Sequence, residues 1–214
     1  MKLIVTTAQS GRLSELAREW AKKLDCPFVA RRDLNLSQLL QEEQAEAVLV
    51  VAAQKISCFY QGSEFFFHPS LAQLRILELE RGQGDNLVHY LDLKPGDQIL
   101  DCTLGLAADA LTAAWAVGAK GRVTGLESSP IIAALVKDGL LNLAGNLAAP
   151  ASRIEVIQTD YRDFLLQAAD NSYDIVYFDP MFRHKIKNSS AMDALRPFTN
   201  QSALEPELLA EAWR

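Results

Sequence analysis

Residues 98–109 read Gln98-Ile99-Leu100-Asp101-Cys102-Thr103-Leu104-Gly105-Leu106-Ala107-Ala108-Asp109, a short apolar run followed by a turn of small residues. The run over 98–102 predicts a buried strand, and residues 108–117, closed by Gly118, predict a helix. This order is typical of Rossmann-like domains, in which the turn lets a cofactor approach the backbone. Ala107 stands where the second glycine of the usual acid-x-x-x-Gly-x-Gly pattern is expected. The stretch raises the hypothesis of a nucleotide-type ligand at the turn.

The alternation of strands and helices continues on the carboxyl side of this stretch. Residues 122–127, 153–157 and 173–178 read as strands, and residues 130–143 and 161–168 read as helices. Such alternation is the signature of a parallel sheet whose crossovers are helical. The predicted fold class is therefore α/β, with a Rossmann-like sheet.

An acidic residue ends or follows each of the four predicted strands: Asp101, Glu127, Asp160 and Asp179. Parallel strands bring their carboxyl ends to one edge of the sheet, so we expect these acids to lie close together. Glu127 could accept both hydroxyls of a ribose, and Asp160 could accept from an adenine amino group. The alternatives are an exposed strand-end carboxylate at Glu127 and a helix N-cap at Asp160. The joint pattern favours S-adenosylmethionine over a dinucleotide, because a sulfonium donor brings no phosphates and carboxylates tolerate a nearby cation.

The fourth strand continues into Asp179-Pro180-Met181-Phe182. This motif resembles the Asp/Asn-Pro-Pro-Tyr/Phe motif of methyltransferases that modify amino groups of nucleobases. An exocyclic amine is a poor nucleophile because its lone pair is delocalised into the ring. The Asp179 carboxylate and the Pro180 carbonyl can each accept one of its N–H bonds, while Phe182 stacks on the base. The alternative is a strand that ends in a proline turn, with Phe182 packed in the core.

A basic cluster directly follows the motif and consists of Arg183, His184, Lys185 and Lys187. The net charge of the chain is −6, which does not indicate a dedicated nucleic-acid-binding surface, since such domains usually carry a basic face. Any contact with RNA must therefore be local. The cluster is the candidate substrate-binding patch, and the alternative is a solvated loop.

With these residues in view, the chain resembles the ribosomal RNA small subunit methyltransferase J family, which methylates N2 of a guanine in small-subunit ribosomal RNA. The resemblance covers about residues 81–198 and is carried by residues 101–110, 126–140 and 176–187. It implies S-adenosylmethionine as the cofactor, ribosomal RNA or the small ribosomal subunit as the partner, and Asp179 at the junction of cofactor and substrate.

The resemblance also implies a set of cofactor contacts, namely Ala108, Asp109, Glu127, Ser128, Asp160 and Tyr161. Together with Asp101, Gly105 and Asp179, these residues make up the predicted cofactor site. The chain departs from the family at Ala107, at Ala108, where an arginine is common, and at Arg183, where a proline is common. These departures are those expected of a divergent branch of the family.

The carboxyl-terminal part of the chain is short for such a domain. A complete seven-stranded methyltransferase sheet needs three further strands after residue 182. Residues 188–200 read instead as a loop, and residues 204–213 read as a helix. We therefore expect that the closing strands are missing from this chain and that it is a fragment.

Residues 1–80 read as a small α/β domain with a β-hairpin around Gly62, and residues 81–214 as the methyltransferase domain. The loop Arg81–Asp85 separates the two. The amino-terminal pattern predicts strands over 3–7, 27–30, 47–52, 57–60 and 64–67, and helices over 10–24, 36–40 and 71–79.

The composition, with 49% hydrophobic and 22% charged residues among 214, is that of a soluble globular protein. No apolar run approaches the roughly 20 residues of a membrane helix, so we expect no membrane segment. Three cysteines without metal spacing and three scattered histidines predict no metal site and a reduced, cytoplasmic protein. The composition does not indicate an oligomeric state.

The sequence therefore predicts an S-adenosylmethionine-dependent N-methyltransferase that acts on the exocyclic amine of a nucleobase, with guanine N2 of small-subunit ribosomal RNA as the favoured target. The lone pair of an amide nitrogen is delocalised as well, which makes it a similarly poor nucleophile. A protein glutamine or a small-molecule amine is therefore the alternative substrate. The non-enzymatic alternative is a Rossmann-like binding module that has lost its cofactor. The retained Glu127, Asp160 and Asp179 argue against that alternative.

Overall fold

The computed structural model describes residues 1–8, 13–179, 196–199 and 212. The chain divides into two compact units, of which the first comprises Met1–Phe67 and the second begins at His68. Helix α3 (Ser70–Glu80) lies between this division and the loop over 81–85, where the sequence predicted the domain boundary.

The first unit is a four-stranded sheet with the order β1-β2-β3-β4 and two helices. β1 and β2 pair in parallel, whereas the β2–β3 and β3–β4 pairs are antiparallel. Buried side chains of Ile4, Leu39, Val48 and Val50 form a core cluster. The elements of this unit are β1 (Leu3–Thr7), α1 (Ser14–Lys23), α2 (Leu36–Glu42), β2 (Ala47–Val51), β3 (Ile56–Tyr60) and β4 (Ser63–Phe66).

The strand predicted over 27–30 is wrong, since the structure has only an isolated parallel bridge between Phe28 and Val5. Pro27 has no backbone N–H, which prevents a longer ladder at this point. Its carbonyl accepts from the Val5 N–H at 2.9 Å, and the Val29 N–H donates to the Val5 carbonyl at 2.8 Å.

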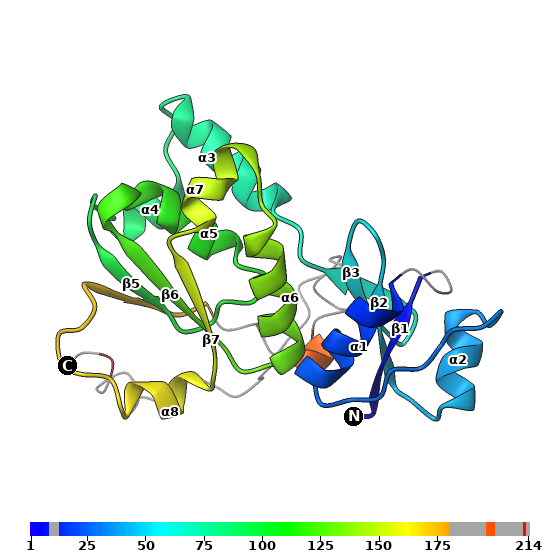
Figure 1. Ribbon diagram of the computed structural model, residues 1–214. Helices are drawn as coiled ribbons and strands as arrows, with labels where there is room; N and C mark the ends of the chain where they lie inside the picture. Colours follow the sequence, from blue (N-terminus) through cyan, green and yellow to red (C-terminus); the bar gives the residue numbers. More distant parts are fainter. Residues whose placement is uncertain (9–12, 180–195, 200–211, 213–214) are drawn as a thin grey trace. The chain divides into compact units, whose positions relative to one another are not determined.

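The second unit contains a parallel sheet and the helices that alternate with its strands (Figure 1). Its elements are α3, α4 (Asn86–Tyr90), β5 (Gln98–Asp101), α5 (Ala108–Ala116), the 3-10 helix η1 (Gly118–Lys120), β6 (Arg122–Glu127), α6 (Pro130–Leu141), the 3-10 helix η2 (Gly145–Leu147), α7 (Ala148–Ala151), β7 (Ile154–Gln158), α8 (Tyr161–Leu165) and β8 (Ile175–Tyr177). A further 3-10 helix, η3, spans Arg196–Phe198, of which Arg196 and Pro197 belong to the first unit and Phe198 to the second.

The four strands of this sheet have the order β7-β6-β5-β8, and every pair is parallel. All four predicted strands are present, and the predicted α/β, Rossmann-like class is confirmed. Asp101 pairs with Gly125 on one side and with Tyr177 on the other, while Glu127 pairs with Gln158. The carboxyl ends of the strands therefore lie in register at one edge, where open α/β sheets bind their ligands.

Side chains alternate between the two faces of the sheet and give it two packed layers. On one face, Leu100, Cys102 and Leu126 form a buried cluster with Leu165 of α8. On the other face, Ile99 and Val123 line a small cavity of about 10 Å³ together with side chains of α4 and α5. Helices on both faces are typical of a doubly wound fold.

The helix ends follow ordinary capping chemistry. Ser129 is the N-cap of α6, with Pro130 in the first turn, and Asn35 and Gln38 form a reciprocal capping box at α2. The sequence did not predict α4, which is a five-residue helix capped by Asp85, whose carboxylate accepts from the Val88 N–H at 3.2 Å. A helix of that length carries too few periodic positions to be recognised.

Gly125 in β6 lets the turn after β5 lie against the sheet. A Cβ at this position would lie 2.5 Å from Leu104 Cδ1, and Leu104 is 4% exposed with little room to move. We expect Gly125→Ala to lower the free energy of unfolding by about 1–3 kcal/mol, through overpacking of this contact. Denaturant unfolding measures the effect, and Gly84→Ala is the matched control because a Cβ there meets nothing within 4 Å. Equal stability of the two variants would contradict the packing argument.

Candidate functional site

The turn between β5 and α5 has the backbone shape of a glycine-rich loop. Gly105 has φ +51° and Ala107 has φ +62°, so both lie in the left-handed region. An alanine in this region carries a steric cost of about 1–2 kcal/mol that a glycine avoids. Ala107 is fully buried, and its N–H donates to the Leu104 carbonyl at 2.9 Å. The turn therefore keeps the glycine-type conformation although Ala107 replaces the expected glycine.

Glu127 connects the end of β6 to this turn. One carboxylate oxygen accepts from the Gly105 N–H at 3.2 Å, and the other accepts from the Ser129 N–H at 2.8 Å. Ser128 also hydrogen-bonds the carboxylate through its side chain. Burial raises the pKa of Glu127 to about 7, although these hydrogen bonds act in the opposite direction. Each carboxylate oxygen has more than one acceptor direction, so the pair can still receive the two hydroxyls of a ribose.

Asp101 is the most deeply buried acid of the site, at 3% exposure. Its carboxylate accepts from the Thr103 N–H at 2.9 Å. The pKa of Asp101 is raised to about 7, mainly by burial and in smaller part by the nearby charges of Asp109, Asp179 and Glu127, while the Thr103 hydrogen bond acts in the opposite direction. Four acids of the predicted cofactor site therefore lie close together in the structure, namely Asp101, Asp109, Glu127 and Asp179.

The raised pKa of Asp101 gives the stability of the fold a pH dependence. The folded pKa of about 7 lies above the ordinary value of 3.8, so the folded state binds more protons than the unfolded state between these values. The contribution of Asp101 to the free energy of unfolding is fully present below pH 3.8 and is lost as the pH rises through 7. We expect Asp101→Asn to be more stable than the parent protein at pH 8, by on the order of a few kcal/mol, with the difference vanishing near pH 4. Denaturant unfolding across pH measures this difference, with Asp163→Asn on the exposed side of α8 as the control. An asparagine variant that is less stable at pH 8 would contradict the argument.

Asp179 follows β8 at the same edge. Its backbone N–H donates to Thr103 Oγ1 at 2.7 Å, so the predicted catalytic acid is tied to the turn after β5. Burial raises the pKa of Asp179, and the charge of Asp109 raises it further.

Asp109, in the first turn of α5, is held from two sides. Tyr177 Oη donates to one carboxylate oxygen at 3.1 Å, and Arg75 Nη1 donates to the other at 2.5 Å. Arg75 and its second partner, Asp85, were not predicted from the sequence. They lie in a different helix and its neighbouring loop, 34 and 24 residues before Asp109, and no local pattern links the three.

Asp160 and Tyr161 lie at the start of α8, and both side chains contact other residues of the chain. Asp160 is the N-cap of α8, and its carboxylate binds the fork of Arg162 through Nε at 2.8 Å and Nη2 at 2.6 Å. The ring of Tyr161 packs edge-on against Phe178, with 5.5 Å between ring centroids. Asp160 thus has the capping contact that was left open as the alternative to an adenine contact.

The remaining predicted residues differ in how far the structure describes them. Ala108 begins α5 directly after the turn. The other predicted catalytic and substrate-binding residues lie outside the described residues, namely Pro180, Phe182, Arg183, His184, Lys185 and Lys187.

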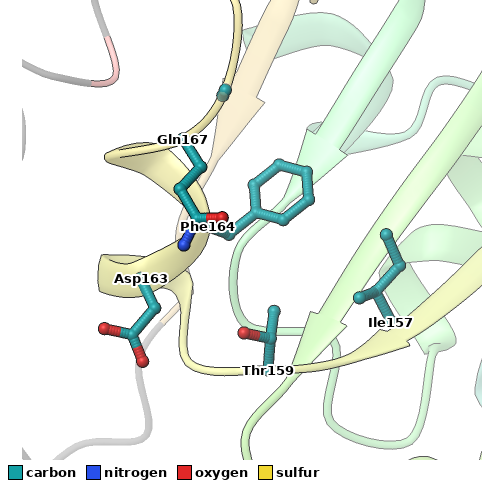
Figure 2. A pocket seen from close by; sticks show the side chains of 6 residues that line it. Ile157, Thr159, Asp163, Phe164 and Gln167 are labelled. Atoms are coloured by element: carbon teal, nitrogen blue, oxygen red, sulfur yellow. The ribbon is translucent and has the colours of Figure 1, made fainter.

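A separate hollow of about 210 Å³ lies between the end of β7 and α8 (Figure 2). It is lined by Ile157, Thr159, Asp163, Phe164, Gln167 and Ala168. Figure 2 shows the Phe164 ring extending from α8 toward Ile157, with the Asp163 carboxylate directed away from it. None of the predicted site residues lines this hollow, and we assign no ligand to it.

Two further properties concern only the part of the chain that the structure describes. Among these residues, no group of three or more histidine, cysteine, aspartate or glutamate side chains could hold a metal ion. No single helix in the same residues is long and apolar enough to cross a membrane, and the pair α6 plus Gly145–Ala151 meets that test only jointly, across a bend of 115°.

The donors and acceptors at this edge fit S-adenosylmethionine. The two ribose hydroxyls and the ammonium group of this cofactor can donate hydrogen bonds to carboxylates, and its positively charged sulfonium centre is attracted by them. Asp101, Asp109, Glu127 and Asp179 supply four carboxylates around one glycine-type turn. A ligand with several phosphate groups would fit this acidic edge less well than one with a cationic centre.

Comparison with known proteins agrees with this chemistry. The sequence model of the family described as "Putative SAM-dependent methyltransferase" matches residues 34–212. The uncharacterized protein YpiP of Bacillus subtilis is 35% identical over 99% of this chain and 84% of its own length. A protein named ribosomal RNA small subunit methyltransferase J from Pseudomonas aeruginosa is 27% identical over 96% of this chain and 78% of its own length.

A solved structure shares the fold. The crystal structure of a SAM-dependent methyltransferase from Neisseria gonorrhoeae has a TM-score of 0.57 and 19% sequence identity, and the match covers 84% of this chain and 70% of that one. The family match covers most of the chain, and the sheet edge described above is the edge at which open α/β sheets bind their ligands. The chain belongs to the family of SAM-dependent methyltransferases, and its cofactor is S-adenosylmethionine.

Proposed function

We propose that this methyltransferase transfers the methyl group to the exocyclic amine of a nucleobase, and that its target is guanine N2 in small-subunit ribosomal RNA. One observation carries the proposal, which is the hydrogen bond from the Asp179 N–H to Thr103 Oγ1. This bond fixes the first residue of the Asp-Pro-Met-Phe motif against the turn after β5, which is the proposed cofactor turn. The names of the methyltransferase J relatives support ribosomal RNA as the substrate class.

In this proposal, the work of the protein is mainly alignment. The Asp179 carboxylate and the Pro180 carbonyl accept the two N–H bonds of the amine, which directs the nitrogen lone pair toward the methyl donor. S-adenosylmethionine, when bound, would supply the methyl group, and its sulfur would keep the electron pair of the broken bond. The methylated nitrogen would then lose one proton, and in this proposal the Asp179 carboxylate accepts it. A carboxylate with a raised pKa is suited to that proton transfer.

The other residues of the motif hold the base. Phe182 stacks on the flat face of the guanine, and the basic cluster Arg183, His184, Lys185 and Lys187 contacts phosphates next to the target. We further propose that Glu127 accepts the ribose hydroxyls of the cofactor. The small amino-terminal domain, proposed to span residues 1–80, is the part of the chain available for docking the rest of the substrate.

The test is methyl transfer to defined acceptors. Small ribosomal subunits from cells that lack this chain are incubated with the protein and labelled S-adenosylmethionine, and the product nucleosides are separated and identified by mass spectrometry. We expect the label in N2-methylguanosine of the small-subunit RNA. Label in another nucleoside would change the target base, and label in ribosomal protein would overturn the nucleobase assignment in favour of an amide substrate.

A further inference from the structure

Arg75 on α3 is the centre of a charged network next to the cofactor edge. Its Nε and Nη2 donate to the two carboxylate oxygens of Asp85 at 2.7 and 2.9 Å, and its Nη1 donates to Asp109 at 2.5 Å. The side chains of Arg75 and Asp85 are 18% and 9% exposed. This bidentate grip on Asp85 orients the guanidinium, because a planar fork bound at two points cannot rotate freely. Asp85 is in turn fixed as the N-cap of α4.

The network ends at Asp109, whose carboxylate is fixed at both oxygens. Arg75 binds one oxygen, and Tyr177 Oη binds the other. Tyr177 lies in β8, two residues before Asp179, and pairs with Asp101 of β5. Asp109 is therefore oriented from α3 on one side and from the central strands on the other. Its side chain remains 31% exposed, so the carboxylate is still accessible to a ligand.

The order of the strands indicates which part of the cofactor faces Asp109. Glu127 ends β6, whereas Asp109 is bonded to Tyr177 in β8, on the far side of β5. The ribose lies between the adenine and the amino-acid end of the cofactor. With the ribose at Glu127 and the reacting methyl at Asp179, the chain of atoms that leads from ribose to sulfur runs toward β8. The amino-acid end then lies on the β5 and β8 side, where Asp109 is held.

We propose that Arg75 is a positioning residue that holds the Asp109 carboxylate for the ammonium group at the amino-acid end of the cofactor. This inference rests on the proposed function, in which the ribose lies at Glu127 and the reacting methyl group at Asp179. Arg75 and Tyr177 each use one acceptor direction of the carboxylate, and the remaining directions accept from the ammonium group. A carboxylate fixed before binding loses less conformational freedom when the ligand arrives, which is why its orientation affects affinity.

The test uses two ligands that differ only at that end. S-adenosylhomocysteine has the amino-acid group, whereas methylthioadenosine keeps the adenine, ribose and thioether but lacks the ammonium and carboxylate groups. Calorimetric titration compares both ligands on the full chain, on Arg75→Met and on Arg75→Lys. We expect Arg75→Met to weaken S-adenosylhomocysteine by about tenfold or more and to leave methylthioadenosine within about threefold. Arg75→Lys should recover part of the loss, because one charged contact to Asp109 can be remade.

Asp109→Asn keeps the shape of the side chain and serves if Arg75→Met does not fold. It should show the same selective loss, since an amide oxygen attracts an ammonium group less than a carboxylate does. Lys55→Met is the control, because it removes the Lys55–Glu64 ion pair of the first unit and should change neither affinity. Equal weakening of both ligands, or of neither, in these variants would overturn the positioning role. Failure of the parent protein to bind S-adenosylhomocysteine would instead count against the cofactor site itself, so the two failures are distinct.

Discussion

Replacing Asp179 with alanine is expected to reduce the rate of methyl transfer by about a hundredfold or more, the usual effect of losing one preorganised polar contact to the reacting group. The carboxylate would accept an N–H bond of the target amine and later its proton, and an alanine can do neither. The backbone bond to Thr103 Oγ1 involves the Asp179 amide and survives the substitution, so residue 179 stays attached to the turn after β5. The effect should therefore appear in the chemical step.

Single-turnover transfer at saturating cofactor and ribosomal subunit measures that step directly. The affinity for S-adenosylhomocysteine, titrated in parallel, should fall by much less than the rate. Asp163→Asn on α8 is the control for a charge removed outside the site and should transfer at the parent rate. An alanine variant that retains full activity would exclude Asp179 as the residue that orients the amine.

The second large effect is expected at Glu127. Its carboxylate would accept both ribose hydroxyls while it holds the Gly105 and Ser129 amides. Hydrogen bonds to a charged group contribute about 1.5–3 kcal/mol each, so Glu127→Ala should weaken S-adenosylhomocysteine by on the order of a hundredfold. The pKa of about 7 adds a pH dependence, because the ionised form is the better acceptor and it is depleted as the pH falls below 7. The affinity of the parent protein should decline between pH 7 and pH 5.

Titration calorimetry of S-adenosylhomocysteine at pH 8, 7, 6 and 5 tests both the loss of affinity in Glu127→Ala and the pH dependence of the parent protein. Glu127→Gln keeps the size and one acceptor oxygen, and it should bind weakly with a flatter pH profile than the parent protein. Glu155→Ala, at an exposed position of β7, is the matched control and should bind as the parent does. Unchanged affinity in Glu127→Ala would remove the residue from the cofactor site and with it the order of ligand groups along the sheet edge.

The elements that could be predicted from the sequence are those that depend on the pattern of neighbouring residues. Apolar runs of four to six residues alternating with helices predicted β5, β6, β7 and β8, and parallel strands place the residues at their ends on one edge by geometry alone. The approach of Asp101, Glu127 and Asp179 to each other followed from that rule. Their pKa shifts did not follow from it, because burial is a property of the packed layers.

The network around Arg75 shows what could not be predicted. Arg75 lies on α3, whereas Asp85 precedes α4 and Asp109 lies on α5, so the three side chains meet only after the three helices have packed. In addition, α3 shows little amphipathic pattern, since Leu71 and Leu74 are exposed. Asp160 shows a different limit. An acid before a helix has the same sequence signature as an N-cap and as a ligand residue. The structure shows that the Asp160 carboxylate caps α8 and binds the fork of Arg162.

Thr103 can couple the binding of the cofactor to the binding of the substrate, because it is hydrogen-bonded to residues of both proposed sites. Its N–H donates to Asp101 and its hydroxyl accepts from the Asp179 amide, so Thr103 connects the proposed cofactor turn to the proposed catalytic acid. A ligand that orders the turn reduces the entropy that the second ligand must lose on binding, and such coupling is reciprocal. In the proposed reaction, cofactor and nucleobase would therefore raise each other's affinity by the same factor. Departure of the spent cofactor would then loosen the hold on the methylated RNA, so that release of one product promotes release of the other.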